Sequence, residues 1–155
     1  MIIRIFFLII FSIISITPQA FAQISLATPA EHVTIKVNIQ ENGDVSVVHV
    51  IKKSDENVQV RLLSGKAENI QVVDGARNEI PHAVSTDGSI VTLIPPEVNF
   101  GVEYDLKDEL ILKDGVWTWD FLYTYSENGV EFYFPKKVDL VFANDRPVSV
   151  IGAEG

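Results

Sequence analysis

An alternation of apolar and polar residues in the first third of the chain constrains the fold more than any other feature. Apolar side chains occupy every second position from Val33 to Ile39, with polar side chains between them. Side chains of a β-strand point in turn to its two faces, so this pattern predicts a strand with one buried face. Residues 45–52 form a second strand-like run, and Asn42-Gly43 lies between the two runs. An Asn-Gly pair in this position predicts a β-hairpin.

Short runs of the same kind follow, separated by Gly, Pro, Asn and Asp at intervals of about 8–12 residues. Apolar residues nowhere recur at helical spacing over three turns. Pro81 cannot donate to a sheet ladder, which predicts an edge strand there, and residues 23–31 form a lead-in that can add another edge strand. The sequence therefore predicts an all-β fold, a two-sheet antiparallel sandwich of immunoglobulin-like type. Strands are expected at residues 58–63, 70–73, 79–84, 89–94, 104–112, 116–123, 130–134, 138–143 and 148–151.

The N-terminal residues 1–22 are typical of a signal peptide, which would form a helix ahead of the domain. Arg4 supplies a positive charge, residues 5–16 form an uncharged apolar core, and Ala20-Phe21-Ala22 predicts cleavage between Ala22 and Gln23. The alternative is an uncleaved anchor, because residues 5–22 carry no charge and could span a thin bilayer. Both alternatives predict a protein that is secreted or held on the extracytoplasmic side of the cytoplasmic membrane.

The remaining residues, 23–155, are predicted to form a single domain. They keep 11 of the 12 Lys and Arg residues and all 21 Asp and Glu residues, so their formal net charge is 11 − 21 = −10. Such an acidic surface repels nucleic acid and anionic lipid headgroups, which excludes nucleic-acid binding as the function. The chain has no cysteine, so it forms no disulfide and no thiolate metal site, and the hydrophobic core must stabilise the fold.

Residues 117–123 hold an aromatic side chain at every odd position, and Asp114-Gly115 predicts a turn before them. Two interpretations are open for rings that share one face of a strand. They form the centre of the core, or they form an exposed platform for sugar rings or for the apolar strip of a partner. The opposite face carries Asp120, the only charge of the run, which favours the ring face as the buried one. The rings are those of Trp117, Trp119, Phe121 and Tyr123.

The ionisable residues lack the spacing of a catalytic or metal-binding site. The three histidines, His32, His49 and His82, fall in different predicted strands without zinc-ligand spacing, and we expect isolated strand or surface histidines. Clustered acidic residues lack the pattern of a calcium-binding loop, and no nucleophile motif of a hydrolase occurs. The sequence therefore predicts no catalytic residue, no metal, no cofactor and no enzymatic activity. The acidic side chains expected to be solvated are Glu41, Asp44, Asp55, Glu56, Asp105, Asp108, Glu109 and Asp120.

Two segments carry a resemblance to a known group of proteins. Residues 112–120 (LKDGVWTWD) and 132–148 (FYFPKKVDLVFANDRPV) resemble a family of exported β-domain proteins of ammonia-oxidising archaea, the Thaumarchaeota. The resemblance implies a signal peptide and an extracytoplasmic β-domain, and it carries over no catalytic residue. Relatives of this kind often continue into a Cys-x-x-Cys segment and a C-terminal membrane anchor. Because the sequence ends at Gly155, it is expected to be either a naturally short, soluble member or a truncated one.

These features together predict a non-catalytic structural or protein-interaction module of the cell envelope, which contacts another envelope protein through a sheet face or loops. One alternative is a carbohydrate-binding module that uses Trp117 and Trp119. Another is an accessory subunit of a larger membrane complex. The sequence leaves open the ligand or partner, the oligomeric state, the strand order and whether the signal segment is cleaved.

Overall fold

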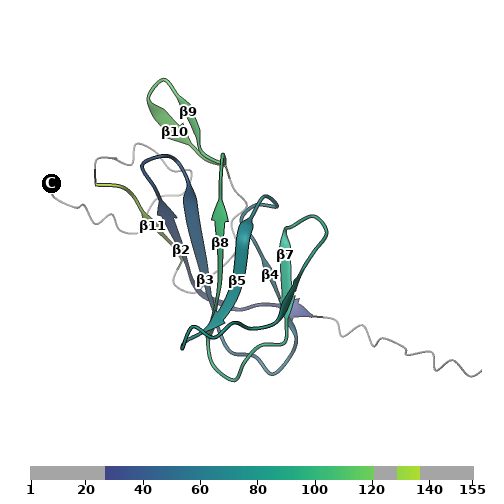
Figure 1. Cartoon of the computed structure of the whole chain (residues 1–155). Coiled ribbons are helices and arrows are strands. Elements are labelled where there is room, and N and C mark those ends of the chain that lie inside the picture. The colour runs from purple at the N-terminus through teal and green to yellow at the C-terminus, as the bar shows by residue number, and fades with distance from the viewer. Residues whose placement is uncertain (1–26, 121–128, 137–155) are drawn as a thin grey trace, which may run out of the picture.

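The computed structural model describes residues 27–120 and 129–136, and the regular structure within these ranges is β throughout (Figure 1). The all-β prediction is therefore confirmed for them. None of these residues belongs to a helix long and apolar enough to cross a membrane. The signal peptide at 1–22, its cleavage between Ala22 and Gln23, and the strands expected at 138–143 and 148–151 lie outside the described residues. The described strands are β1 (Thr28–Pro29), β2 (His32–Ile39), β3 (Val45–Ile51), β4 (Val58–Arg61), β5 (Glu68–Asp74), β6 (His82–Val84), β7 (Ile90–Leu93), β8 (Phe100–Leu106), β9 (Ile111–Lys113), β10 (Val116–Thr118) and β11 (Val130–Tyr133).

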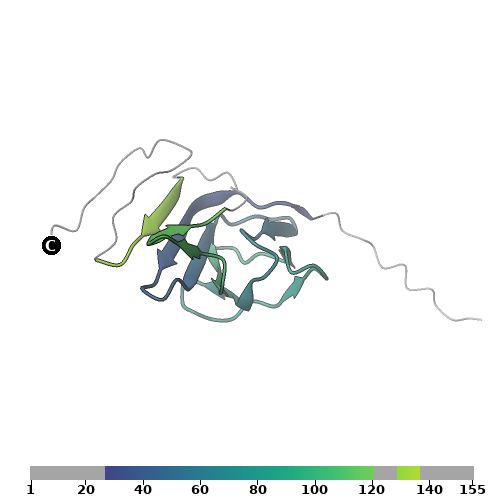
Figure 2. The same ribbon diagram turned by 90° about the horizontal axis from the view of Figure 1, so that it is seen from above.

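These strands form two large sheets and one separate hairpin. The larger sheet has the order β11-β2-β3-β8-β5, the second has the order β1-β4-β7-β6, and β10 pairs with β9 alone. In Figure 2, a view from above, β11 lies beside β2 at the edge of the larger sheet. Apolar side chains of both large sheets belong to one buried cluster. The architecture is consistent with a β-sandwich.

The sheets are mixed, whereas the sequence predicted antiparallel pairing. β1 runs parallel to β4, and β11 runs parallel to β2 with Val130 opposite Ile35. The Thr34 hydroxyl reinforces the second pairing by donating to Glu131 Oε1 at 3.2 Å. Parallel neighbours require a long crossover rather than a tight turn, and both pairs are separated along the chain by several other strands. The alternation of side chains is the same in both kinds of sheet, so it could not reveal the direction.

The predicted hairpin of β2 and β3 is confirmed. The two strands pair antiparallel from Ile39 opposite Val45, and the five residues 40–44 connect them. The Gly43 amide donates to the Gln40 carbonyl at 3.0 Å, and the Gln40 amide donates to the Asp44 carbonyl at 2.8 Å. Gly43 has a φ of +88°, a left-handed conformation that glycine adopts without the steric cost of a Cβ.

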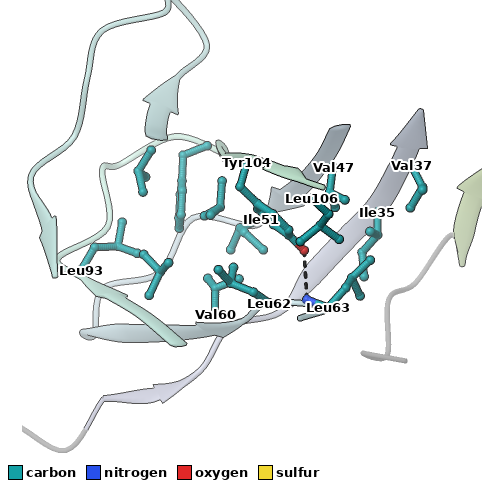
Figure 3. Close-up of a cluster of buried hydrophobic side chains, with 14 of the residues drawn as sticks. Ile35, Val37, Val47, Ile51, Val60, Leu62, Leu63, Leu93, Tyr104 and Leu106 are labelled. Atoms are coloured by element: carbon teal, nitrogen blue, oxygen red, sulfur yellow. Dashed lines mark hydrogen bonds between the residues drawn. The ribbon is translucent and has the colours of Figure 1, made fainter. Parts of the chain in front are cut away.

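Alternate side chains of β3 and β8 point into the core, as their burial pattern shows. Val47 and Leu106 are fully buried there, and Val60 approaches from the second sheet (Figure 3). Val60 and Val91 of that sheet have no exposed surface. Burying one such side chain contributes about 1.5–3 kcal/mol of transfer free energy. With no cysteine in the chain, this cluster is the main source of stability.

Both predicted edge strands occupy edges of the four-stranded sheet. β6 follows Pro81 and pairs only with β7 within that sheet, as expected where a proline removes a backbone donor. β1, from the lead-in segment, forms the opposite edge beside β4.

Candidate functional site

Of the predicted aromatic residues, the structure describes Trp117, which lies in the β9–β10 hairpin, and Trp119, which follows it. Asp114 and Gly115 connect the strands with φ values of 52° and 80°, and Lys113 pairs with Val116. Two consecutive residues with positive φ are typical of a type I′ turn, whose twist suits a two-residue hairpin. The turn predicted at Asp114-Gly115 is therefore confirmed. In Figure 1 this hairpin projects beyond the end of the larger sheet.

β10 is shorter than the predicted strand at 116–123. Its last paired residue is Thr118, opposite Ile111, so Trp119 and Asp120 no longer pair with β9. Glu109 lies two residues before β9, and its carboxylate accepts a hydrogen bond from Ser64 Oγ of the sandwich at 2.9 Å. Leu110, which the register of β9 and β10 would place opposite Trp119, packs with Trp119 against the hydrophobic core cluster instead. Phe121 and Tyr123 lie outside the described residues.

The two indoles lie in different places. Trp117 covers the turn between β2 and β3, where a Cβ built on Gly43 would be 2.8 Å from its Cη2 and Cζ3 atoms. Trp119 packs against the hydrophobic core cluster. Both side chains are partly buried, whereas Asp120 beside them is exposed. The hairpin is thus attached to the sandwich by its aromatic side chains.

The contact between Trp117 and Gly43 predicts that a side chain added at Gly43 destabilises the fold. Gly43→Ala is expected to lower the free energy of unfolding by about 2–4 kcal/mol, because it adds a left-handed alanine and a clash with the indole. Gly115→Ala is the matched control: its φ is +80°, but its Cβ would meet nothing within 4 Å. Gly115→Ala should lower the free energy of unfolding by only about 1–2 kcal/mol, the cost of a left-handed alanine without a clash. Urea denaturation followed by tryptophan fluorescence measures both, and equal losses would show that Trp117 does not cover the turn.

Most of the exposed apolar surface lies at the end of the sandwich that carries this hairpin. Within the described part of the chain, nine large apolar side chains are exposed. Six of them come from β9, from β10, and from the end of β11 and the residue that follows it. β11 runs parallel to β2 toward the β2–β3 turn, and Trp117 covers that same turn, so the strands meet at one end. We call this set the apolar end: Ile111, Leu112, Val116, Phe132, Tyr133 and Phe134.

The acidic residues that the structure describes do not converge on a cation site. In the part of the chain that the structure describes, no group of three or more His, Asp or Glu side chains could hold a metal ion. Asp105 instead accepts from Ser46 Oγ at 3.0 Å and from Asn69 Nδ2 at 2.9 Å. Asp44 accepts from the Asn42 side-chain amide at 2.7 Å at the hairpin turn. Asp44 and Asp105 therefore form hydrogen bonds that stabilise a turn and the surface of a strand.

A buried pair of histidines was missed by the sequence analysis. His32 Nε2 lies 2.9 Å from His49 Nδ1, and the two residues are 3% and 0% exposed. The prediction of isolated histidines is therefore wrong for both. It fits His82, which is partly buried in β6 and donates from Nδ1 to the Ile80 carbonyl at 3.0 Å.

A β-bulge explains why the pair was missed. Strict alternation from Ile35 places Val33 on the buried face and His32 on the solvated face. The register shifts between His32 and Thr34, so that His32 is opposite Ile51 while Ile35 is opposite His49. One additional residue in a strand reverses the side-chain phase beyond it. The bulge therefore turns His32 inward, onto the same face as His49.

Hydrogen bonds continue from this pair to the second sheet. The Leu63 amide donates to the Tyr104 hydroxyl oxygen at 3.0 Å, so the Tyr104 hydroxyl donates onward to His49 Nε2 at 2.8 Å. His49 must then carry its proton on Nδ1 and donate to His32 Nε2. His32 also forms a hydrogen bond with the Ala30 backbone. Every polar group is satisfied with both imidazoles neutral. We call His32, His49, Tyr104 and the Leu63 amide the His–Tyr chain.

Burial keeps all three side chains of the His–Tyr chain neutral. Loss of hydration, and to a smaller extent the neighbouring His32, lowers the pKa of His49 to about 3. Burial also lowers the pKa of His32, against an opposing effect of its bond to the Ala30 backbone. Burial raises the pKa of Tyr104, with the Leu63 amide acting in the opposite direction. The His–Tyr chain is thus a neutral set of hydrogen-bonded groups that is buried in the core.

Comparison with known proteins does not identify a family for this chain. The sequence matches no protein-family model, no curated protein and no solved structure. The function is therefore argued from the residues themselves.

Proposed function

We propose that this chain is a non-catalytic protein-interaction module of the cell envelope, an exported sandwich of immunoglobulin-like type. It docks another envelope protein through the apolar end. The single observation that carries the proposal is the gathering there of six of the nine exposed large apolar side chains. Scattered apolar residues are normal on a protein surface, whereas exposed apolar side chains gathered at one end of a domain are typical of an interaction site.

The β9–β10 hairpin supports this proposal by its own energetics. A two-stranded hairpin is at best marginally stable in water without further packing. Ile111 and Leu112 of β9 are 65% and 54% exposed, and Val116 of β10 is 46% exposed. A partner that covers these side chains would bury apolar area and stabilise the hairpin at the same time.

The charges beside the hairpin indicate the chemistry of the partner. Within residues 108–120, Asp108, Asp114 and Asp120 are exposed against one exposed cation, Lys113; Lys136 is exposed two residues after Phe134. Opposite charges across the rim of an interface speed association and select the correct partner. The docking surface of the partner is therefore expected to be an apolar strip with lysine or arginine at its rim.

Sugar binding by Trp117 and Trp119 is the alternative. A sugar platform needs aromatic faces open to the ligand, whereas Trp117 covers the β2–β3 turn and Trp119 packs on the core cluster. This arrangement favours the interaction module. A red shift or quenching of tryptophan fluorescence on addition of oligosaccharides, lost in Trp117→Ala, would instead support the carbohydrate-binding alternative.

Site-specific photo-crosslinking tests the proposal. A benzophenone amino acid at Leu112 is expected to give a discrete crosslinked protein in cells that export the chain. The same amino acid at Ile94, which is 75% exposed but outside the apolar end, is the control and should give none. Ile111→Glu should abolish the product without unfolding the protein, because exposed substitutions cost within about 0.5 kcal/mol. Equal products from both positions, or none from Leu112, would contradict the proposal.

A further inference from the structure

The His–Tyr chain connects the two large sheets. His32, His49 and Tyr104 come from β2, β3 and β8 of the five-stranded sheet. Leu63 lies just after β4 of the other sheet, and Figure 3 shows its amide bonded to the Tyr104 hydroxyl across the core. The contact therefore fixes the segment after β4 against the inner face of the larger sheet.

The direction of these hydrogen bonds leaves no position for an additional proton. A proton on His32 Nε2 would face the N–H of His49 Nδ1 at 2.9 Å. The pair keeps a hydrogen bond only if His49 moves its own proton to Nε2. That proton would then point at the Tyr104 oxygen, 2.8 Å away, and the phenol hydrogen would lose its acceptor. One added proton thus produces a buried charge and an unsatisfied hydroxyl, both of which are costly.

No neighbouring carboxylate among the described residues compensates such a charge. The ionisable groups that face each imidazole are the other imidazole and the phenol of Tyr104. β8 also carries Glu103 and Asp105, but these alternate onto the outer face of the sheet, where they bond to Arg77 and to Ser46.

The charged residues of the other surrounding elements also lie away from the pair. Glu31 and Lys52 pair with each other at the surface at 2.8 Å. Arg61 of β4, Glu68 of β5 and Asp120 after β10 are exposed, and β7 has no charged residue. Glu131 of β11 bonds to the hydroxyls of Thr34 and Tyr133 rather than to an imidazole. Around the imidazoles the core is apolar, including Ile35 and Ile51.

We propose that the His–Tyr chain is an acid-sensitive switch that holds the two sheets together while both imidazoles are neutral and frees the segment after β4 when the pair takes up a proton. Histidine in the unfolded chain titrates near pH 6.5, above both folded-state values, so protons favour the unfolded chain. The stabilisation is complete above that pH and is lost as the pH falls. The folding equilibrium constant should decrease about tenfold per pH unit through His49 as the pH falls below 6.5, and His32 adds to the decrease.

Urea denaturation between pH 7.5 and 4.5 tests the switch. Between pH 6.5 and 4.5 the wild-type folding equilibrium constant is expected to fall about 50-fold through His49, with a further decrease through His32. His49→Gln should remove the His49 share of this fall. His82→Gln is the matched control and should follow the wild type. Asp74 and Asp87, whose hydrogen bonds lower their pKa values from 3.8, lose their contribution mainly below this window. An unchanged slope in His49→Gln would overturn the proposal.

A second measurement on the wild type applies even if His49→Gln does not fold. Nitrogen NMR of the imidazoles should show His49 protonated on Nδ1 and uncharged down to pH 4.5. Hydrogen exchange should show the Leu63 amide losing protection on acidification before the amides of the β2–β3 hairpin. Titration of His49 near pH 6.5 in the folded protein, or a Leu63 amide that stays protected with the hairpin, would refute the switch.

Discussion

Replacing Tyr104 by phenylalanine is expected to lower the free energy of unfolding by about 2–5 kcal/mol, although only one oxygen is lost. The ring remains in the core, so its packing is kept. The Leu63 amide loses its acceptor and His49 Nε2 loses its donor, in a place where Tyr104 is 3% exposed. Each buried polar group left without a partner costs about 1–3 kcal/mol. Urea denaturation at pH 7.5 measures the difference.

Tyr133→Phe is the matched control for this change. The Tyr133 hydroxyl also makes a short bond, to Glu131 Oε2 at 2.6 Å, but the residue is 48% exposed. Water can replace the lost partner there, so the expected loss is below about 1 kcal/mol. If Tyr104→Phe cost no more than Tyr133→Phe, the His–Tyr chain would not contribute to stability.

Ile35→Ala is expected to lower the free energy of unfolding by a comparable amount, about 2–5 kcal/mol, for a different reason. Ile35 has no exposed surface and lies in β2 opposite His49, within the cluster shared by both sheets (Figure 3). Truncation removes apolar contacts and leaves a cavity that the paired strands cannot close. The measurement is the midpoint of urea denaturation at constant slope, which separates a change in stability from a change in the exposed area.

Ile94→Ala is the control that separates burial from residue type. Ile94 is 75% exposed, so the same truncation there should cost within about 0.5 kcal/mol. Similar losses at Ile35 and Ile94 would contradict a core centred between the two sheets.

Local patterns predicted those parts of the fold that depend on residues near each other in the sequence. The β2–β3 hairpin follows from alternation plus Asn42-Gly43, and the β9–β10 turn follows from Asp114-Gly115. The edge position of β6 follows from Pro81, which lacks the donor that a central strand needs. Each of these depends on φ values, donors or faces that one short segment determines.

The His–Tyr chain could not be predicted in this way. His32 and His49 are separated by 17 positions and Tyr104 by 55 more, and only the strand order brings them together. The bulge before Thr34 has no glycine or proline to mark it, and it places His32 on the face opposite to the one that alternation indicates. A histidine on the buried face of β3, between Val47 and Ile51, was the one available signal. It indicated that His49 needed a polar partner but not which residue provides it.

The environments of Trp117 and Trp119 also depend on distant segments. Alternation placed the two indoles on one face, but the turn that lies under Trp117 comes from the β2–β3 hairpin, more than seventy residues earlier. Whether a ring in a strand is covered depends on which element packs on it, and the sequence contains that information only through the tertiary fold.

Assembly of the five-stranded sheet is expected to end with β11. β2 and β3 meet across five residues, whereas β2 and β11 meet only when the chain from Ile39 to Val130 closes into a loop. Closing a longer loop costs more entropy, so this contact forms late. A chain delivered with its N-terminus first leaves the backbone donors and acceptors along one side of β2 without their native strand until β11 arrives. Pairing with a second unfinished molecule is then the main hazard, and it ends when β11 is in place.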